Sequence, residues 1–206
     1  MSSSPPGRPQ DPAITDALLR VGERVMRTDG YSRLTVESLC SEIGTTRPAF
    51  YRRFPNVAHL AFAVISSRYG NEPTPDTGSL AGDVLELQRG EVLMFSDPLL
   101  HRNLPGILES VRTDLDVARL YGEGFMGPRR VRVVRVVDRA VARGEIGPPH
   151  DLPFVCDVLV GPILTRALLP GPGGLDEDLA RSTADAALAL LRAAQPVGRA
   201  PERGGS

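Results

Sequence analysis

Several residue types are scarce or missing in this chain of 206 residues. Lysine and tryptophan are absent, aromatic residues make up 5%, and there are only two cysteines, Cys40 and Cys156. Two distant cysteines exclude a disulfide framework, and each lies in an apolar helical pattern, so we expect buried free thiols. Because the chain has no run of about 18 apolar residues, we expect no membrane span.

The sequences at both ends of the chain predict unstructured tails. Residues 1–10 lack the apolar segment of a secretory signal, and residues 195–206 are rich in proline, glycine and arginine. We expect both tails to be disordered and the protein to be cytoplasmic. The hydrophobic residues, 41% of the whole chain, are enough to bury a core between the tails.

Charge is unevenly distributed, although the net charge is only −1. Residues 1–70 hold nine arginines and six acidic residues, a net charge of +3. The other residues hold fifteen arginines and nineteen acidic residues, a net charge of −4. A basic N-terminal part on an acidic body is the polarity expected when the N-terminal part binds nucleic acid.

The segment TVESLCSEIGTTRPAFYRRF, residues 35–54, predicts two short helices and a tight turn. The apolar stripe of the first helix has the spacing i, i+3, i+4 and i+7, and consists of Val36, Leu39, Cys40 and Ile43. Thr35 can cap this helix, Glu37 suits its N-terminal dipole, and Gly44 can end it with a positive φ.

The second helix is predicted to run from a cap at Thr45 or Thr46 to Phe54, where the next residue is a proline. Pro48 lies in its first turn, where a missing N–H costs little. Phe50 and Phe54 are four residues apart and point inward. The outward side then carries Arg47, Pro48, Tyr51 and Arg52.

These outward residues have the chemistry of a protein that reads the major groove of DNA. Arginine can pair with guanine or phosphate, and hydroxyl groups bind phosphate oxygens. Pro48 and Ala49 can offer apolar contact, for example to a thymine methyl group. The two helices alone are equally compatible with an ordinary helical hairpin that has a solvated basic edge. The choice between a DNA-binding unit and such a hairpin therefore depends on the surrounding chain.

Helical patterns flank this segment on both sides. Asp11 and Pro12 start a helix that runs to about Gly30, and another begins near Val57. The whole block resembles the N-terminal domain of the tetracycline-repressor (TetR) family of bacterial transcription regulators. The residues that carry the resemblance are Gly30-Tyr31, Leu34-Thr35-Val36, Leu39, Ile43-Gly44 and the run from Thr46 to Asn56.

The resemblance implies a helix-turn-helix DNA-binding domain over residues 11–69. The DNA contacts that it implies come from Thr35, Thr46, Arg47, Tyr51 and Arg52, and Pro48 adds an apolar surface. The family often has glycine at the position of Pro48 and lysine at that of Val57. Arg53 and His59 are candidates to replace that lysine, although a surface histidine without a role is the simpler interpretation of His59.

Beyond a loop over residues 70–78, the pattern is helical throughout, and no alternating strand pattern of useful length occurs. Helices are expected over residues 79–96, 97–112, 114–144 with a kink at Gly127-Pro128, 151–169 and 176–194. We therefore predict an all-α protein. As the resemblance implies, a helical domain over residues 79–194 follows the DNA-binding domain and serves ligand binding and dimerisation.

The last two predicted helices have apolar surfaces that suit a second copy of the chain. The candidates are Phe154, Val155, Val158, Leu159, Gly161, Pro162, Ile163 and Leu164 in one helix, and Ala184, Ala187, Leu188 and Leu191 in the other. The resemblance implies a homodimer with a symmetric four-helix interface. The alternative is that both faces are simply the core of one subunit.

Leucine, methionine and aromatic residues of the helical domain could line a pocket for a small molecule. The candidates are Leu87, Met94, Phe95, Leu104, Leu108, Tyr121, Phe125 and Met126. The resemblance implies a small-molecule effector, and this lining would suit a largely apolar one. Ordinary core packing is the simpler explanation of each of these residues.

Other polar patterns predict no chemistry. An arginine stripe, Arg132, Arg135, Arg139 and Arg143, could bind an anion, but a solvated face is the simpler interpretation. His101 and His150 have no second ligand at metal spacing, and no acidic pair lies beside a nucleophile or a phosphate-binding loop. We expect no catalytic residue, no metal site and no cofactor.

The sequence therefore predicts a homodimeric DNA-binding transcriptional regulator. Its partners would be a palindromic double-stranded operator and a small molecule that releases the protein from it. An activator and a DNA-binding protein without an effector remain open. A helical ligand-binding protein or enzyme with a vestigial helix-turn-helix is the alternative from another functional class.

Overall fold

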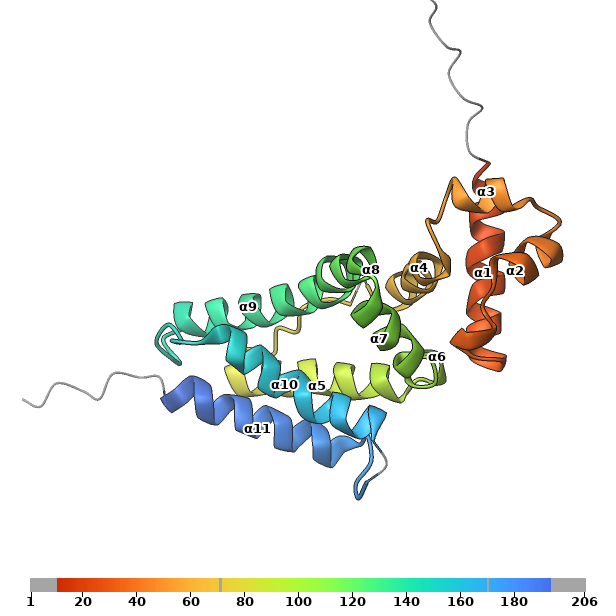
Figure 1. Ribbon diagram of the computed structural model, residues 1–206. Helices are drawn as coiled ribbons and strands as arrows, with labels where there is room; N and C mark the ends of the chain where they lie inside the picture. Colours follow the sequence, from red (N-terminus) through yellow and green to blue (C-terminus); the bar gives the residue numbers. More distant parts are fainter. Residues whose placement is uncertain (1–10, 71, 170, 194–206) are drawn as a thin grey trace, which may run out of the picture. The chain divides into compact units, whose positions relative to one another are not determined.

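The computed structural model describes residues 11–70, 72–169 and 171–193, and the two predicted tails, residues 1–10 and 195–206, lie outside these ranges. The described residues form helices and connecting turns with no strand among them, which confirms the all-α prediction. The chain divides into two compact units (Figure 1). One combines the chain up to residue 71 with Pro98–Gly127, and the other combines Glu72–Asp97 with the chain from Pro128 onward.

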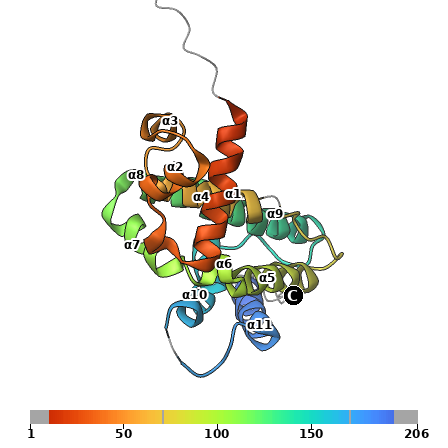
Figure 2. The ribbon, with the colours of Figure 1, turned by 90° about the vertical axis from the view of Figure 1, so that its right-hand side faces the viewer.

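The first unit starts with four α-helices, which we call the head, and a 3-10 turn, Tyr31–Arg33, lies between the first two. They are α1 Pro12–Thr28, α2 Val36–Ile43, α3 Arg47–Tyr51 and α4 Val57–Tyr69. Each helix begins with a side-chain cap that accepts a hydrogen bond from an N–H of the first turn, and the caps are Asp11, Thr35, Thr46 and Asn56. Asp11 and Thr35 agree with the sequence prediction, and Thr46 is one of the two caps that it offered for α3. α1 packs across α4 and against α2 (Figure 2).

Two glycines allow the tight geometry of the head. Gly44 ends α2 with a φ of 65°, in the left-handed region that side chains rarely adopt. Gly22 lies where α1 approaches α4, and a Cβ atom at that position would be 3.3 Å from the side chain of Leu60. The turn and the close helix crossing together fix α2 and α3 on the rest of the head.

α3 is shorter than predicted, because the α-helix ends at Tyr51 and not at Phe54. The N–H groups of Arg52 and Phe54 still bond to carbonyls four residues back. That of Arg53 bonds to the carbonyl of Phe50, only three residues back. The chain therefore tightens as it leaves the helix, in the way that helix ends often do.

The second stretch of the first unit contains α6 Pro98–His101, α7 Leu104–Thr113, α8 Leu115–Leu120 and a π-helical segment, Tyr121–Met126. Asn103, just before α7, is 1% exposed and donates hydrogen bonds to the carbonyls of Met26 in α1 and Leu99 in α6. The hydroxyl of Tyr31 bonds to that of Ser110 in α7. These contacts group the stretch with the head, although the sequence placed it in the domain over residues 79–194.

The helix predicted over residues 114–144 is divided into α8, the π-helical segment and α9. The N–H of Gly127 bonds to the carbonyl of Gly122, five residues back, which widens the turn. Pro128 follows and has no N–H to donate. The widened turn lies at the position of the predicted kink.

The second unit consists of α5 Leu80–Ser96, α9 Gly127–Ala142, α10 Leu152–Leu168 and α11 Glu177–Ala193. α5 packs against α10 and α11, which also pack against each other. The core is aliphatic and includes Leu80, Val84, Leu87, Val136, Val137, Ala140, Val155, Leu159, Ala184, Ala187, Leu188 and Leu191.

The predicted partner surface of α11 lies inside its own unit. Its four residues, which are at most 6% exposed, are Ala184, Ala187, Leu188 and Leu191. Val155, Leu159 and Ile163 of α10 are also buried. For these residues the dimer-interface prediction is wrong and the alternative, subunit core, is right. Periodicity shows which face of a helix is apolar, but not which neighbour covers that face.

The arginine stripe of α9 is largely engaged rather than solvated. Arg139 and Arg143 approach the carboxylate of Asp83 in α5, at 3.5 and 3.6 Å. Asp83 is fully buried and accepts hydrogen bonds from the N–H and the hydroxyl of Thr77, at 2.6 and 2.9 Å. The predicted solvated face is therefore wrong for these two arginines, which hold the segment before α5 against α9.

Replacing Asp83 with alanine leaves two partly buried arginines without their shared carboxylate. Breaking a buried ion pair costs about 3–5 kcal/mol, and we expect about 2–3 kcal/mol because both arginines keep some contact with water. Urea unfolding followed by circular dichroism measures the loss. Asp138→Ala, on the exposed side of α9, is the matched control and should change the unfolding free energy by less than about 0.5 kcal/mol. Equal losses in the two variants would contradict the role of Asp83.

Candidate nucleic-acid interface

Two threonine caps frame the turn between α2 and α3. The hydroxyl oxygen of Thr35 accepts the N–H of Ser38 at 3.1 Å, and that of Thr46 accepts the N–H of Ala49 at 3.3 Å. Both threonines remain exposed to solvent. The caps therefore fix the start of each helix while leaving the N-terminal end of α3 open to an approaching phosphate, which helix N-termini favour.

All six residues predicted to contact DNA lie on the surface of the head. They are Thr35, Thr46, Arg47, Pro48, Tyr51 and Arg52. The side chain of Arg47 is 61% exposed, and Tyr51 is 54% exposed. The ring of Tyr51 packs edge-to-face on Phe50, with a centroid distance of 5.5 Å, which directs the phenol outward. Their contacts with DNA stay a prediction.

The inward side of α3 anchors it to the head. Phe50 is fully buried, Phe54 is 9% exposed, and their ring centroids are 5.9 Å apart. Ala49 is only 5% exposed, so the predicted contact between Ala49 and a thymine methyl group is wrong. The packing of Ala49, Phe50 and Phe54 thus determines which side of the short helix faces away from the protein.

Arg53 clamps the end of α3 to the start of α1. Its guanidinium donates to the hydroxyl of Thr15 at 3.0 Å, to the carbonyl of Asp11 at 2.9 Å and to that of Ala49 at 2.8 Å. The sequence offered Arg53 as a phosphate contact and missed this role. The only hint of this role in the sequence was that Arg53 lies one residue beyond Arg52, and so off the outward side that Pro48 and Arg52 share.

The start of α4 lies beside an acidic hollow. Asn56 caps the helix and its amide approaches Asp114 at 3.4 Å, and His59 bonds to the oxygen of Asn56 at 2.9 Å. The hollow, of about 290 Å³, is lined by Pro55, Asn56, His59, Asp114, Asp116, Arg119, Leu120 and Glu123. Three carboxylates against one arginine make this hollow unsuitable for an anion. A phosphate contact by His59 stays a prediction.

The residues predicted to line a ligand pocket fall into both units. Leu104, Leu108, Tyr121 and Phe125 belong to the first, where Tyr121 packs against Phe62 of α4 and against Phe125. Leu87 and Met94 belong to α5 in the second unit and are each 3% exposed. Leu87 is part of the aliphatic core of that unit, as the simpler explanation proposed.

A buried ionic cluster lies next to Met94. Arg129 and Arg132 of α9 flank the carboxylate of Glu91 in α5, at 3.4 and 4.0 Å, and Arg132 also pairs with Glu72 at 2.9 Å. The three central side chains are only 11–13% exposed. Burial raises the pKa of Glu91, and the two arginines partly oppose this shift. The interpretation of Arg132 as part of a solvated stripe is therefore wrong, and the sequence did not single out Glu91 and Arg129 as a pair.

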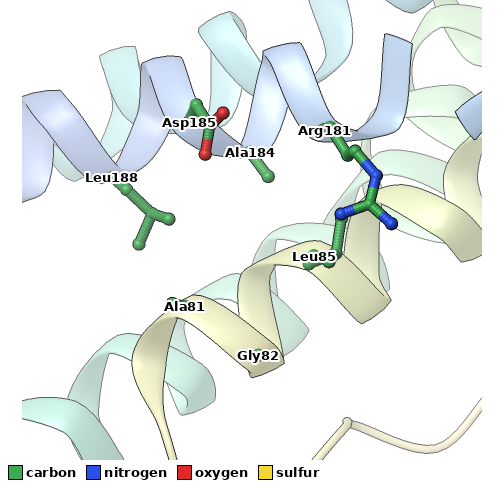
Figure 3. A pocket seen from close by; sticks show the side chains of 7 residues that line it. All are labelled: Ala81, Gly82, Leu85, Arg181, Ala184, Asp185 and Leu188. Carbon is green, nitrogen blue, oxygen red and sulfur yellow. The ribbon is translucent and has the colours of Figure 1, made fainter. Parts of the chain in front are cut away.

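A groove between α5 and α11 is a further hollow of the second unit (Figure 3). Its lining consists of Ala81, Gly82 and Leu85 of α5, and Arg181, Ala184, Asp185 and Leu188 of α11. Its volume of about 260 Å³ is smaller than the usual range for small-molecule pockets. Arg181 extends towards Leu85 and also pairs with Glu177 at 2.7 Å, so the charge of this arginine is already engaged.

The outer face of α10 includes residues that the sequence selected for the interface, whereas the outer face of α11 differs from the selected one. On α10 the exposed or half-exposed residues include Phe154, Val158, Gly161, Pro162, Thr165 and Leu169 at its C-terminal cap. On α11 they include Ser182, Ala186, Ala189, Leu190 and Ala193. These residues recur at helical spacing, and most are small or apolar, which permits close approach of another helix.

The two cysteines lie in different units. Cys40 and Cys156 are both free and buried, as predicted, and burial raises the pKa of each thiol. Within the described ranges, no three histidine, cysteine or acidic side chains converge as a metal site. No helix in the same ranges has the length and apolar composition needed to cross a bilayer.

Family models match both parts of this chain. The model for bacterial regulatory proteins of the tetR family matches residues 18–64, and the model for the tetracyclin repressor-like C-terminal domain matches residues 74–187. The chain belongs to the TetR family. The first match covers most of the head, and the second covers more than half of the chain. This TetR-family protein is therefore a helix-turn-helix, DNA-binding transcriptional regulator.

Named relatives and solved structures align with most of this chain. The chain is 27% identical over 179 residues to the DNA-binding transcriptional repressor TetR of Mycobacteroides abscessus, an alignment that covers 85% of this chain and 93% of that protein. The solved structure of the TetR-family regulator SCO0332 has a TM-score of 0.69 at 22% identity, covering 85% and 97% of the two chains. FadR of Bacillus subtilis, solved with stearoyl-CoA, has a TM-score of 0.64 at 14% identity, covering 84% and 96%.

Arg47→Ala and Tyr51→Ala should each weaken binding to DNA that the wild type selects from a random pool. We expect a loss of about tenfold or more for each, because one side-chain contact to a base or phosphate contributes about 1–3 kcal/mol. Fluorescence anisotropy titrations measure the dissociation constants. Arg68→Ala removes an exposed arginine from the far end of α4 and is the control. Wild-type affinity in both α3 variants would refute the assignment of α3 as the DNA-reading helix.

Proposed function

We propose that this protein is a homodimeric repressor that binds a palindromic operator and is released by a small molecule. The main support for the proposal is the placement of the five-residue helix α3. Its inner side is anchored to the head, and Arg47, Tyr51 and Arg52 lie on its outer side. Guanidinium, phenol and hydroxyl groups supply donors for base edges and phosphates. Since the target is chromosomal DNA, the protein acts in the bacterial cytoplasm.

A dimer supplies the selectivity that one head lacks. A helix as short as α3 can contact only a few base pairs, whereas two heads about 34–36 Å apart read two half-sites on one face of the duplex. The outer faces of α10 and α11 support a twofold interface, because both are mostly apolar or small. Ala186 lies near the centre of the α11 face, where a partner helix would pack most closely.

Two of the similar proteins support a repressor that responds to a ligand. The Mycobacteroides abscessus relative is named a DNA-binding transcriptional repressor, and the FadR structure contains stearoyl-CoA. In this chain, an effector that contacts Met94 would also meet Arg129, which lies against the sulfur of Met94. We therefore place an anionic or hydrogen-bond-accepting group on the effector, in addition to the largely apolar part that the sequence predicted.

The regulatory effect needs a difference in affinity between two states of the protein. An effector shifts the equilibrium only if it binds more tightly to the state that does not bind the operator. Glu72, at the start of the segment that enters α5, shares Arg132 with the cluster around Glu91. An anionic group bound to Arg132 would compete with Glu72, which links ligand binding to the connection between the DNA-binding helices and α5.

Selection from a random DNA pool should yield an inverted repeat with half-sites about one helical turn apart. Light scattering should give a mass of twice 22.1 kDa for the wild type. Ala186→Glu should give a monomer that loses the repeat, because it places a charge in the proposed interface. Ala142→Glu, on an exposed position of α9, should remain a dimer with wild-type affinity. A wild type that is monomeric or binds all duplexes equally would overturn the proposal.

Matched pairs of carboxylic acids and their neutral amides test the effector's chemistry by thermal shift. Decanoate, as one such probe, should raise the melting temperature by about 5 °C at a hundredfold excess over its Kd, and decanamide should do so less. Arg132→Met should abolish the difference. Arg135→Met removes an exposed arginine of the same helix and should preserve it. Equal shifts with both probes, or no shift with either, would contradict an anionic anchor for such ligands.

A further inference from the structure

An acidic side chain lies beside the outward arginine of α3. Glu37, in the first turn of α2, pairs with Arg47, the first residue of α3, at 3.1 Å between Oε2 and Nη2. Glu42, the other acidic residue of α2, turns instead towards α1, where it pairs with Arg24 at 2.5 Å. The two glutamates of α2 therefore differ in one respect that matters for DNA, since only Glu37 reaches the recognition helix.

Stability does not explain the pairing of Glu37 with Arg47. The two side chains are 80% and 61% exposed, and an exposed ion pair contributes at most about 1 kcal/mol. A carboxylate in the first turn of α2 also favours the helix dipole, but that effect needs no contact with α3. The position of Glu37 therefore bears mainly on what Arg47 can do at the surface of the head.

At a DNA duplex, Glu37 opposes binding in a way that does not depend on base sequence. Phosphates repel its carboxylate, and the carboxylate neutralises the guanidinium of Arg47 while the two are paired. Both side chains must also lose part of their water when the duplex approaches. A head with Glu37 consequently binds an arbitrary duplex less tightly than the same head without this charge.

Only some base pairs can compensate for this effect. In the major groove, the amino group of cytosine donates to a carboxylate, while guanine O6 and N7 accept from arginine. Glu37 and Arg47 stand side by side, so neighbouring cytosine and guanine bases would satisfy both at once. At other sequences the carboxylate is left without a donor, which raises the free energy of the wrong complex.

We propose that Glu37 is a specificity-determining residue of the head. It lowers the affinity for DNA in general, and a base with a major-groove amino group next to the site of Arg47 restores that affinity. The inference rests on the proposed function, because it assumes that α3 reads an operator. It assigns to an acidic residue of α2 a role in choosing the operator, in addition to the basic and hydroxyl residues predicted to bind it.

Glu37→Gln removes the charge while keeping the shape, and Glu42→Gln makes the same change on the same helix away from α3. Fluorescence anisotropy with full-length protein compares two probes: a random-sequence duplex and the duplex that the wild type selects from a random pool. Glu37→Gln should tighten binding to the random duplex about fivefold and steepen its salt dependence by about one phosphate contact. Selected-duplex affinity should rise less or fall, so that the ratio of the two affinities decreases at least about threefold.

The outcomes distinguish a failure of the role of Glu37 from a failure of the proposed function. Glu42→Gln should change both affinities by less than about twofold and leave their ratio intact. If Glu37→Gln leaves the ratio at the wild-type value, or shifts the random duplex no more than Glu42→Gln does, the role of Glu37 is wrong and the proposed function stands. If the wild type itself prefers no sequence, the proposed function fails, and this inference fails with it.

A double-mutant cycle shows whether Glu37 acts through Arg47. In the Arg47→Ala background, Glu37→Gln should tighten binding to the random duplex by clearly less than the fivefold seen with Arg47 present, because part of the effect is the release of the guanidinium. Fully additive changes would show that Glu37 acts on phosphates alone and would overturn the paired mechanism. Thermal unfolding of each variant checks that the head remains folded, as expected for exposed positions.

Discussion

The anchoring of α3 is the constraint on which the rest of this structure depends. A helix of five residues has no stability of its own, because isolated helices shorter than about 12–15 residues are marginal in water. Phe50 and Phe54 hold it from below, Thr46 caps its start, and Arg53 ties its end to α1. The outward direction of its polar groups is thus a consequence of contacts made on the opposite side.

Local signals in the sequence were sufficient for most of the head. The caps Asp11 and Thr35, the positive φ of Gly44 and the inward direction of Phe50 each depend on residues within one or two helical turns. Such features can be predicted because the physical cause and the effect are neighbours in the chain. The end of α3 was wrong by three residues, since its last turn tightens around the carbonyl of Phe50.

Long-range contacts were the part that the sequence could not reveal. The apolar stripe of α11 was correctly identified as apolar, but Ala184 and Ala187 are covered by helices of the same unit. Arg139 was identified as charged and helical, but its partner Asp83 lies 56 residues away in the chain. Arg53 and Ala49 were misplaced for the same reason, because the choice between solvent, DNA and α1 depends on how the helices pack.

Arg47 of the head and the arginines around Glu91 are placed in opposite environments, which matters in a chain that contains no lysine. In the head, Arg47 is presented to solvent, where a planar guanidinium can pair with bases or phosphates in two parallel hydrogen bonds. In the second unit, Arg129 and Arg132 are withdrawn from solvent among carboxylates of α5 and the segment before it. Burying these charges costs free energy. We propose that they serve to bind a complementary group of a ligand.

The first unit is assembled from two stretches of chain that are separated by α5. Asn103 reaches back to the carbonyl of Met26, and Ser110 to the hydroxyl of Tyr31, across more than 75 residues. During synthesis on the ribosome, the helix-turn-helix emerges long before the residues that complete its compact unit. A fragment that ends at residue 70 would lack Asn103 and Ser110, so Met26 and Tyr31 would lose these hydrogen bonds. The compact unit that contains the DNA-binding helices is therefore not one continuous segment of the chain.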